Sequence, residues 1–203
     1  MAPKDYDQSV FINCPFDDEY TPLFDAIVFT VHDLGFSPRS ARERLDSGEM
    51  RLAKIVDLIS ASRYSIHDLS RTDLDKVTAL PRFNMPFELG IDLGCRTFGP
   101  GYDDKSILIF DSEKYRYQKY ISDLAGLDIQ HHGGDPSRAI VKVRHWLRAA
   151  AGIPFRAGQT VYKRYIQFRD DLPAICEELH LDIDDLSFPD FSFAIAKWLR
   201  DRT

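Results

Sequence analysis

The chain has 203 residues, enough for one α/β domain with an appendage and for a sizeable hydrophobic core. Hydrophobic residues make up 44% of it and charged residues 29%, as in an ordinary globular protein. A formal net charge of -6 argues against a broad nucleic-acid-binding face, and no apolar run has the length of a membrane span. We therefore expect a cytoplasmic protein with neither partner.

Cysteine usage points to the same compartment. Cys14, Cys95 and Cys176 are widely spaced and odd in number, which favours free, mostly buried thiols over a disulfide framework. Their spacing is not that of a zinc site. His131 and His132 are neighbours in a predicted strand, so their side chains point to opposite faces and do not predict a metal site.

The first half of the chain begins with a β-prone run, "SVFINC" (9–14), which ends at Pro15. Apolar residues then recur at three- and four-residue steps from Thr21, which predicts an amphipathic helix that ends near Gly35. A short strand, "FSPR", leads into the polar loop "SARERLDSGEM" (40–50). The run "RLAKIVDLISASR" predicts a second helix, and its apolar face is expected to hold Leu52, Ile55, Val56 and Ile59.

The second half repeats the alternation. "YSIHDLS" (64–70) predicts a strand, a polar loop with Pro81 follows, and "MPFELGIDLGCR" (85–96) begins a helix. "KSILIFD" (105–111) predicts a buried strand, "YRYQKYISDLAG" (115–126) a helix and "LDIQHH" (127–132) a short strand. The next helix is marked by Asp135 as N-cap and Pro136 at its first position.

Strands that alternate with helices predict an α/β fold: a flavodoxin-like, doubly wound, mainly parallel five-stranded sheet. The rhythm breaks at "AGIPFRAG". We therefore assign residues 1–150 to the sheet domain and 151–203 to a C-terminal helical extension, with two helices around the acidic turn "LDIDDLSFPDF".

In such a sheet, ligands bind beyond the carboxyl ends of the strands. The first strand delivers Asn13, Pro15, Phe16 and Asp17 to that edge, the 40–50 loop delivers Arg42, and the third strand delivers Asp68, Ser70 and Arg71. The helix with Asn84, Phe87 and Glu88 begins on the same side. We expect these side chains to form one binding crevice.

Three stretches also carry a resemblance to Toll/interleukin-1 receptor (TIR) domains. "SVFINCPFDDEY" is similar to their first conserved box, and "LGFSPRSARERLDSGEMRLAKIVDLISASRYSIHDLS" to the strand, loop, helix and strand that follow. "NMPFELGIDLG" takes the place of a small motif that ends in Glu-Leu. The resemblance covers roughly residues 8–150.

The resemblance implies an activity and a catalytic residue. In enzymatic TIR domains the motif glutamate, which corresponds to Glu88, is essential for cleaving the nicotinamide–ribose bond of NAD, by hydrolysis or with cyclisation of ADP-ribose. NAD is then a substrate, and neither a further cofactor nor a metal is required. The resemblance also implies a bacterial antiviral-defence effector that assembles as a homo-oligomer through the 40–50 loop, under the control of an activating partner or a small signal.

Two other functions fit parts of the pattern. "NCPF" and "FELG" resemble the nucleoside 2-deoxyribosyltransferases, which also cleave an N-glycosidic bond with a glutamate. A non-catalytic TIR-type module that signals by self-association is the third reading, with Glu88 structural.

Each candidate residue also has a purely structural interpretation. Glu88 fits a first-turn acid that complements the helix dipole. Asn13 and Asp68 fit turn caps, Arg71 a solvated charge and Cys14 a buried thiol.

Overall fold

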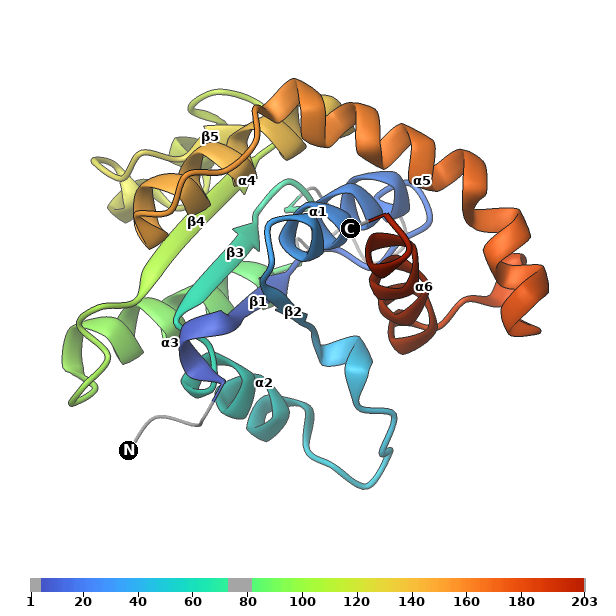
Figure 1. The fold of residues 1–203 in the computed structure, drawn as a ribbon. Coiled ribbons are helices and arrows are strands. Elements are labelled where there is room, and N and C mark those ends of the chain that lie inside the picture. Colours follow the sequence, from blue (N-terminus) through green and yellow to red (C-terminus); the bar gives the residue numbers. More distant parts are fainter. Residues whose placement is uncertain (1–4, 73–81, 203) are drawn as a thin grey trace.

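The computed structural model describes residues 5–72 and 82–202. Within these ranges the centre of the molecule is a five-stranded, all-parallel sheet with the strand order β2-β1-β3-β4-β5 (Figure 1). The strands are β1 (Ser9–Asn13), β2 (Ser37–Arg39), β3 (Tyr64–Asp68), β4 (Ser106–Asp111) and β5 (Gln130–His131). This order is that of flavodoxin-like folds, so the predicted fold class is confirmed.

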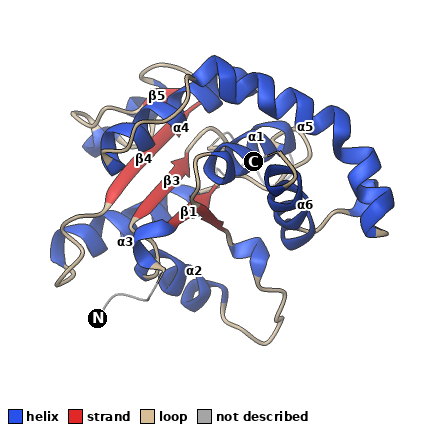
Figure 2. Cartoon of the chain, viewed as in Figure 1, coloured by secondary structure: helices blue, strands red, loops and turns tan. Residues whose placement is uncertain are grey.

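Helices cover both faces of the sheet (Figure 2). The described helices are α1 (Thr21–Asp33), α2 (Arg51–Ser60), α3 (Asn84–Phe98), α4 (Pro136–Ala151), α5 (Gly158–Leu179) and α6 (Phe188–Arg200). α2 and α3 pack on one face, and α1 and α4 pack together on the other. α5 and α6 contact α1 from outside, and α5 also contacts α4, so these two helices add a further layer on that side.

Two helix ends show why the sequence signals were informative. Gly35 follows α1 with a φ of 84°, a conformation that glycine adopts without a Cβ penalty, and this lets the amide of Phe36 donate to the carbonyl of Val31 at 3.0 Å. At the start of α4, the carboxylate of Asp135 accepts from the amide of Ser137 at 2.8 Å. Both predicted boundaries are confirmed.

Two local predictions were wrong. In α2 the buried residues are Lys54, Ile55, Leu58 and Ile59, whereas Leu52 and Val56 are 45% and 43% exposed. The helix therefore faces the sheet through a stripe rotated from the expected one, because Lys54 bonds the carbonyl of Arg44 and is drawn inward.

The segment 115–126 is not a continuous helix. It forms two short 3-10 turns, Arg116–Lys119 and Ser122–Leu124. Arg116 and the hydroxyl of Tyr120 both bind the carboxylate of Asp111, at 2.9 and 3.0 Å, and these contacts hold the segment against the end of β4.

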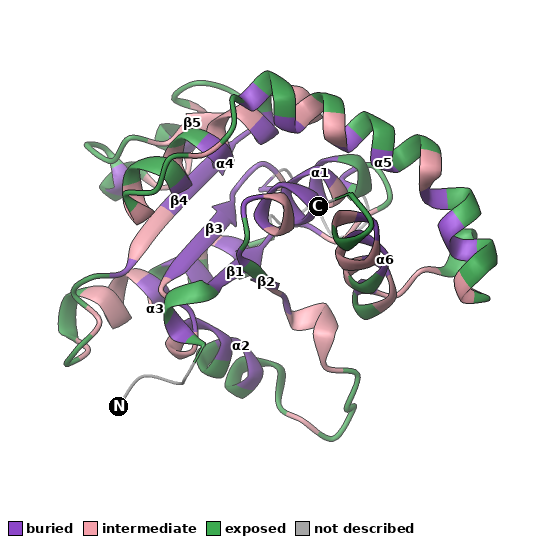
Figure 3. Cartoon of the chain, viewed as in Figure 1, coloured by how far each residue is buried: buried purple, intermediate pink, exposed green. Residues whose placement is uncertain are grey.

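The hydrophobic core continues from the sheet into the C-terminal helices. Val10, Ile66 and Phe110 of the sheet share one buried cluster with Phe168 of α5 and Trp198 of α6. Figure 3 shows the same arrangement, with buried strands at the centre and an exposed outer stripe along α5. The extension thus packs on the sheet domain, while the division of the chain at residue 150 stays a prediction.

The described part of the chain has no helix with the length and apolar character needed to cross a lipid bilayer. The polar loop predicted around Pro81 lies outside the described residues.

Candidate active site

A cleft of about 370 Å³ opens at the carboxyl edge of the sheet. This volume falls within the range of small-molecule sites, roughly 300–1,000 Å³. The described residues that line it are Cys14, Pro15, Phe16, Asp17, Arg51, Arg71, Arg82, Asn84 and Met85. They follow β1 and β3 or begin α2 and α3, so the structure brings together five of the predicted residues: Pro15, Phe16, Asp17, Arg71 and Asn84.

The cleft is rich in cations. Three of its described lining residues are the arginines Arg51, Arg71 and Arg82, and its one described acidic residue is Asp17. Arg71 lies 3.0 Å from the Asp17 carboxylate and 2.7 Å from that of Glu19. Carboxylates thus accompany two of these arginines, Arg71 here and Arg51 through its contact with Glu88.

Glu88 is not among the described residues that line the cleft, although the sequence predicted it there. It is four residues after Asn84 in α3 and only 4% exposed, so it faces the sheet rather than solvent. Its Oε1 lies 3.5 Å from the Arg51 guanidinium, and no group among the described residues donates a hydrogen bond to Oε2. Glu88 is therefore connected to the cleft through Arg51, which lines it.

Burial sets the protonation behaviour of this carboxylate. Loss of hydration raises the pKa of Glu88, although Arg51 and His67 oppose the shift. A poorly hydrated carboxylate with a free oxygen interacts strongly with a nearby positive charge.

A buried polar network lies next to Glu88 along the same face of α3. His67 of β3 lies 2.9 Å from the carboxylate of Asp92, one helical turn after Glu88. The other ring nitrogen of His67 lies 3.0 Å from the Asn13 amide, and Lys105 lies 3.2 Å from Asp92. Asn13 therefore bonds within the fold, at 2% exposure, and does not line the cleft.

Asp68 and Ser70 do not line the cleft either. Neighbouring residues of a strand point to opposite faces, so Asp68 points away from His67, toward α1. Its carboxylate accepts from the Tyr20 hydroxyl at 2.6 Å and from the Ser70 amide at 2.8 Å, and it lies 3.0 Å from His132. These partners satisfy Asp68, which holds the β3 exit turn in place.

The remaining predicted residues lie elsewhere. Phe87 is 59% exposed, because the residue before an inward-facing Glu88 points sideways from the helix. Arg42 stacks on the far side of Phe16, with its guanidinium carbon 4.5 Å from the ring centre. Two other arginines near Arg42, Arg39 and Arg44, form ion pairs with Glu43 and Glu49, at 2.6 and 2.7 Å.

Sequence reasoning missed Arg51, Arg82 and Met85 as lining residues, and His67 and Asp92 as supporting residues. The four-residue spacing of Glu88 and Asp92 was the available signal, since it places both acids on one helix face. Arg51 gave no signal, because its role depends on how α2 packs against α3.

Within the described ranges, no cluster of His, Cys, Asp and Glu has the arrangement of a metal site. Comparison of the chain with protein-family models, curated proteins and solved structures gave no match. The chemistry of the cleft is therefore the basis for assigning a function.

Proposed function

We propose that this chain is a TIR-like hydrolase that cleaves the nicotinamide–ribose bond of NAD, with Glu88 as the catalytic carboxylate. One observation carries the proposal: among the three arginines that line the cleft, Arg51 contacts the buried carboxylate of Glu88, whose Oε2 has no hydrogen-bond partner among the described residues. A dinucleotide has the matching features, a diphosphate for the arginines and a glycosidic bond for the glutamate.

The arginines account for substrate binding. Guanidinium groups bind phosphate oxygens in a planar, two-pronged geometry and keep their charge at all ordinary pH values. Arg51 and Arg71 reach the cleft from different elements and would grip the diphosphate from two sides. Phe16, in the same wall, offers an aromatic surface for a base or the nicotinamide ring.

The glutamate accounts for bond cleavage. Nicotinamide carries a positive charge in NAD and leaves without help from an acid, so the barrier lies in the developing positive charge on the ribose. A fixed carboxylate stabilises that charge, and its effect grows where water is excluded. Burial at 4% exposure gives Glu88 such surroundings.

Substrate binding and carboxylate access are coupled through Arg51. The side chain of Arg51 is 53% exposed and contacts Glu88 through one nitrogen–oxygen pair, Nη2 and Oε1, 3.5 Å apart. A diphosphate in the cleft would compete for this guanidinium and leave the carboxylate to the ribose. The positive charge of Arg51 would then pair with the diphosphate instead of with Glu88.

The arginines also favour a nucleotide over a nucleoside. They argue against a 2-deoxyribosyltransferase that acts on an uncharged nucleoside, whereas one that acts on a nucleotide would also use them. The proposal also includes the assembly that the resemblance to TIR domains implies. The chain would form a homo-oligomer through the 40–50 loop, and a partner or a small signal would activate it. The products, ADP-ribose or its cyclised form, follow from whether water or the adenine ring attacks the ribose.

The experiment compares the wild-type chain with Glu88→Gln, at high protein concentration and with a crowding agent, on NAD and separately on deoxynucleosides. We expect nicotinamide release by the wild type and a loss of about a hundredfold or more with Glu88→Gln, as for removal of a transition-state electrostatic contact. Glu177→Gln, an exposed glutamate of α5, is the matched control and should retain full activity.

Two outcomes would contradict the proposal. Free base released from deoxynucleosides but no nicotinamide from NAD would support the transferase reading. No turnover of any substrate by the assembled protein would support a non-catalytic module.

A further inference from the structure

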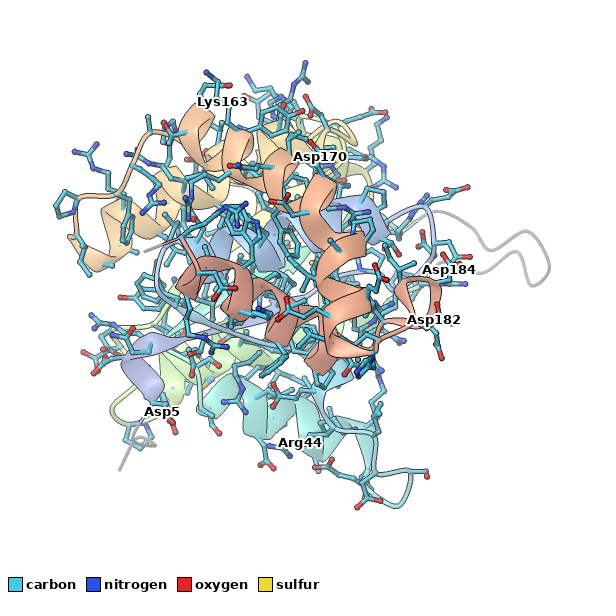
Figure 4. The ribbon with its side chains drawn as sticks, turned by 45° about the vertical axis from the view of Figure 1, so that its right-hand side comes forward. Asp5, Arg44, Lys163, Asp170, Asp182 and Asp184 are labelled. Carbon is cyan, nitrogen blue, oxygen red and sulfur yellow. The ribbon has the colours of Figure 1, made fainter. Side chains whose placement is uncertain are left out.

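A second cavity, separate from the cleft, lies where the C-terminal helices meet the sheet domain. Its volume is about 230 Å³, and its lining comes from the start of α1, the 40–50 loop, the end of α5 and the start of α6. The turn between α5 and α6 carries Asp182 and Asp184 at the outer end of this pair of helices (Figure 4). The two cavities share no described lining residue.

Arg42 is the cation of this second cavity. Its guanidinium is partly buried, stacks on the rings of Phe16 and Phe24 at 4.5 and 5.0 Å, and donates to the carbonyl of Phe16 at 3.2 Å. No described carboxylate lies within ion-pair distance of it. The other arginine of the lining, Arg169, is already paired with Asp25.

The charge of Arg42 is only partly compensated, because Asp25 and Asp18 interact with it electrostatically but no described carboxylate pairs with it directly. Burial lowers the pKa of Arg42, since loss of hydration penalises its charged form. The stacking rings compensate in part, because cations are attracted to aromatic faces. A bound anion would supply the missing counter-charge.

The buried part of the lining is apolar. Phe24, Leu172, Phe188 and Phe191 contribute buried side chains to it, and the Arg42 guanidinium lies on the Phe24 ring, whereas the charged Asp25 is half-buried and Asp184 is exposed. A ligand here meets a guanidinium and packed rings together. Inorganic phosphate would use the first feature only, and a neutral aromatic compound the second only.

We propose that this cavity is a binding site for a small molecule with an aromatic ring and one anionic group, such as an aryl phosphate or aryl carboxylate, which Arg42 recognises. The site does not depend on the function proposed for Glu88. The two sites adjoin, because Arg42 contacts Phe16 and Phe16 lines the cleft.

The test measures binding of phenyl phosphate by titration calorimetry, with inorganic phosphate and benzyl alcohol as probes that each carry one of the two features. Phenyl phosphate should bind more tightly than either.

Arg42→Met should weaken the binding of phenyl phosphate by about tenfold or more, as expected for loss of a charge-assisted hydrogen bond. Asp184→Asn should tighten binding, because it removes a negative charge from the rim. Arg71→Met, in the cleft, should leave binding unchanged.

Asp184 is exposed, so its variant tests the proposal even where Arg42→Met does not fold. Equal loss of binding with Arg71→Met would place the ligand in the cleft and overturn the proposal. So would a lack of binding at millimolar phenyl phosphate, or an affinity that Asp184→Asn does not raise. None of these outcomes depends on NAD turnover, so the two proposals stand or fall separately.

Discussion

At the scale of single residues, burial decides what each ionisable group does. Glu88 and Asp92 are one turn apart on α3 and both are buried, yet their pKa values move in opposite directions. Asp92 has His67 and Lys105 as close partners, which outweigh the loss of hydration and lower its pKa. Among the described residues Glu88 has the longer contact with Arg51 and an electrostatic interaction with His67, and burial prevails over both. The opposite pKa shifts distinguish Asp92, a structural acid, from Glu88, the candidate catalytic acid.

His32 offers a test of burial that is independent of function. In the last turn of α1 a charged histidine would complement the helix dipole, but burial lowers the pKa of His32 to about 4 from its usual 6.5. The unfolded chain then binds more protons between these values, so the free energy of unfolding decreases as the pH falls through this window. By pH 5 the loss from His32 is about 2 kcal/mol.

The variant His32→Leu should reduce the pH dependence of unfolding by this amount, measured as urea denaturation at pH 7 and pH 5. His145→Leu, on the exposed surface of α4, is the control and should follow the wild type. An acid sensitivity that His32→Leu leaves unchanged would show that His32 is hydrated in the native state.

At the scale of elements, buried aromatic side chains anchor α6: Phe188 and Phe191 each contact one phenylalanine of another helix, and Trp198 contacts two. Trp198 is 1% exposed, lies 5.8 Å from the rings of both Phe29 and Phe168, and donates from its indole to Asp171 at 2.8 Å. It joins α6 to α1 and α5 in one contact. The C-terminal helices are thereby fixed on the sheet domain.

Trp198→Ala should lower the free energy of unfolding by about 3–5 kcal/mol, the cost of a large cavity in a packed core. Phe193→Ala is the matched control, because Phe193 belongs to the same helix but is 53% exposed, and its effect should stay within about 0.5 kcal/mol. Equal effects of the two variants in chemical denaturation would mean that α6 is not docked as described.

At the scale of the whole molecule, the segment between β2 and α2 exposes apolar side chains close to the candidate site. Leu45 is 79% exposed and Met50 74% exposed, and Arg51 follows directly. In the proposed function this segment is the assembly loop. A neighbouring copy bound to it would lie next to Arg51, the residue that contacts Glu88.

The double variant Leu45→Ser, Met50→Ser should weaken self-association, measured by sedimentation, and lower NAD turnover at high protein concentration. Its free energy of unfolding should change by no more than about 0.5 kcal/mol per substitution, because both side chains are exposed. Phe98→Ser, at the far end of α3 and 86% exposed, is the control for a general loss of apolar surface. Unaltered sedimentation of the double variant would argue against the loop as an interface.

The sequence was sufficient to predict those residues of the candidate site that directly follow a strand in the chain. Pro15, Phe16 and Asp17 follow β1 directly, so knowing the strand was enough to place them. Asn13 and Asp68 were misplaced because a strand end offers two faces, and only the packing of α1 and α3 determines which face meets a partner.

The sequence by itself determined the alternation of strands and helices, and with it the fold class, because hydrophobic periodicity and end caps act over a few neighbouring residues. Only the tertiary structure decided that Arg51 meets Glu88, that arginines from three segments share one cleft, and that Arg42 faces a second cavity. Such contacts join residues distant in the chain, and the angles at which whole elements pack determine them. No local pattern encodes those angles.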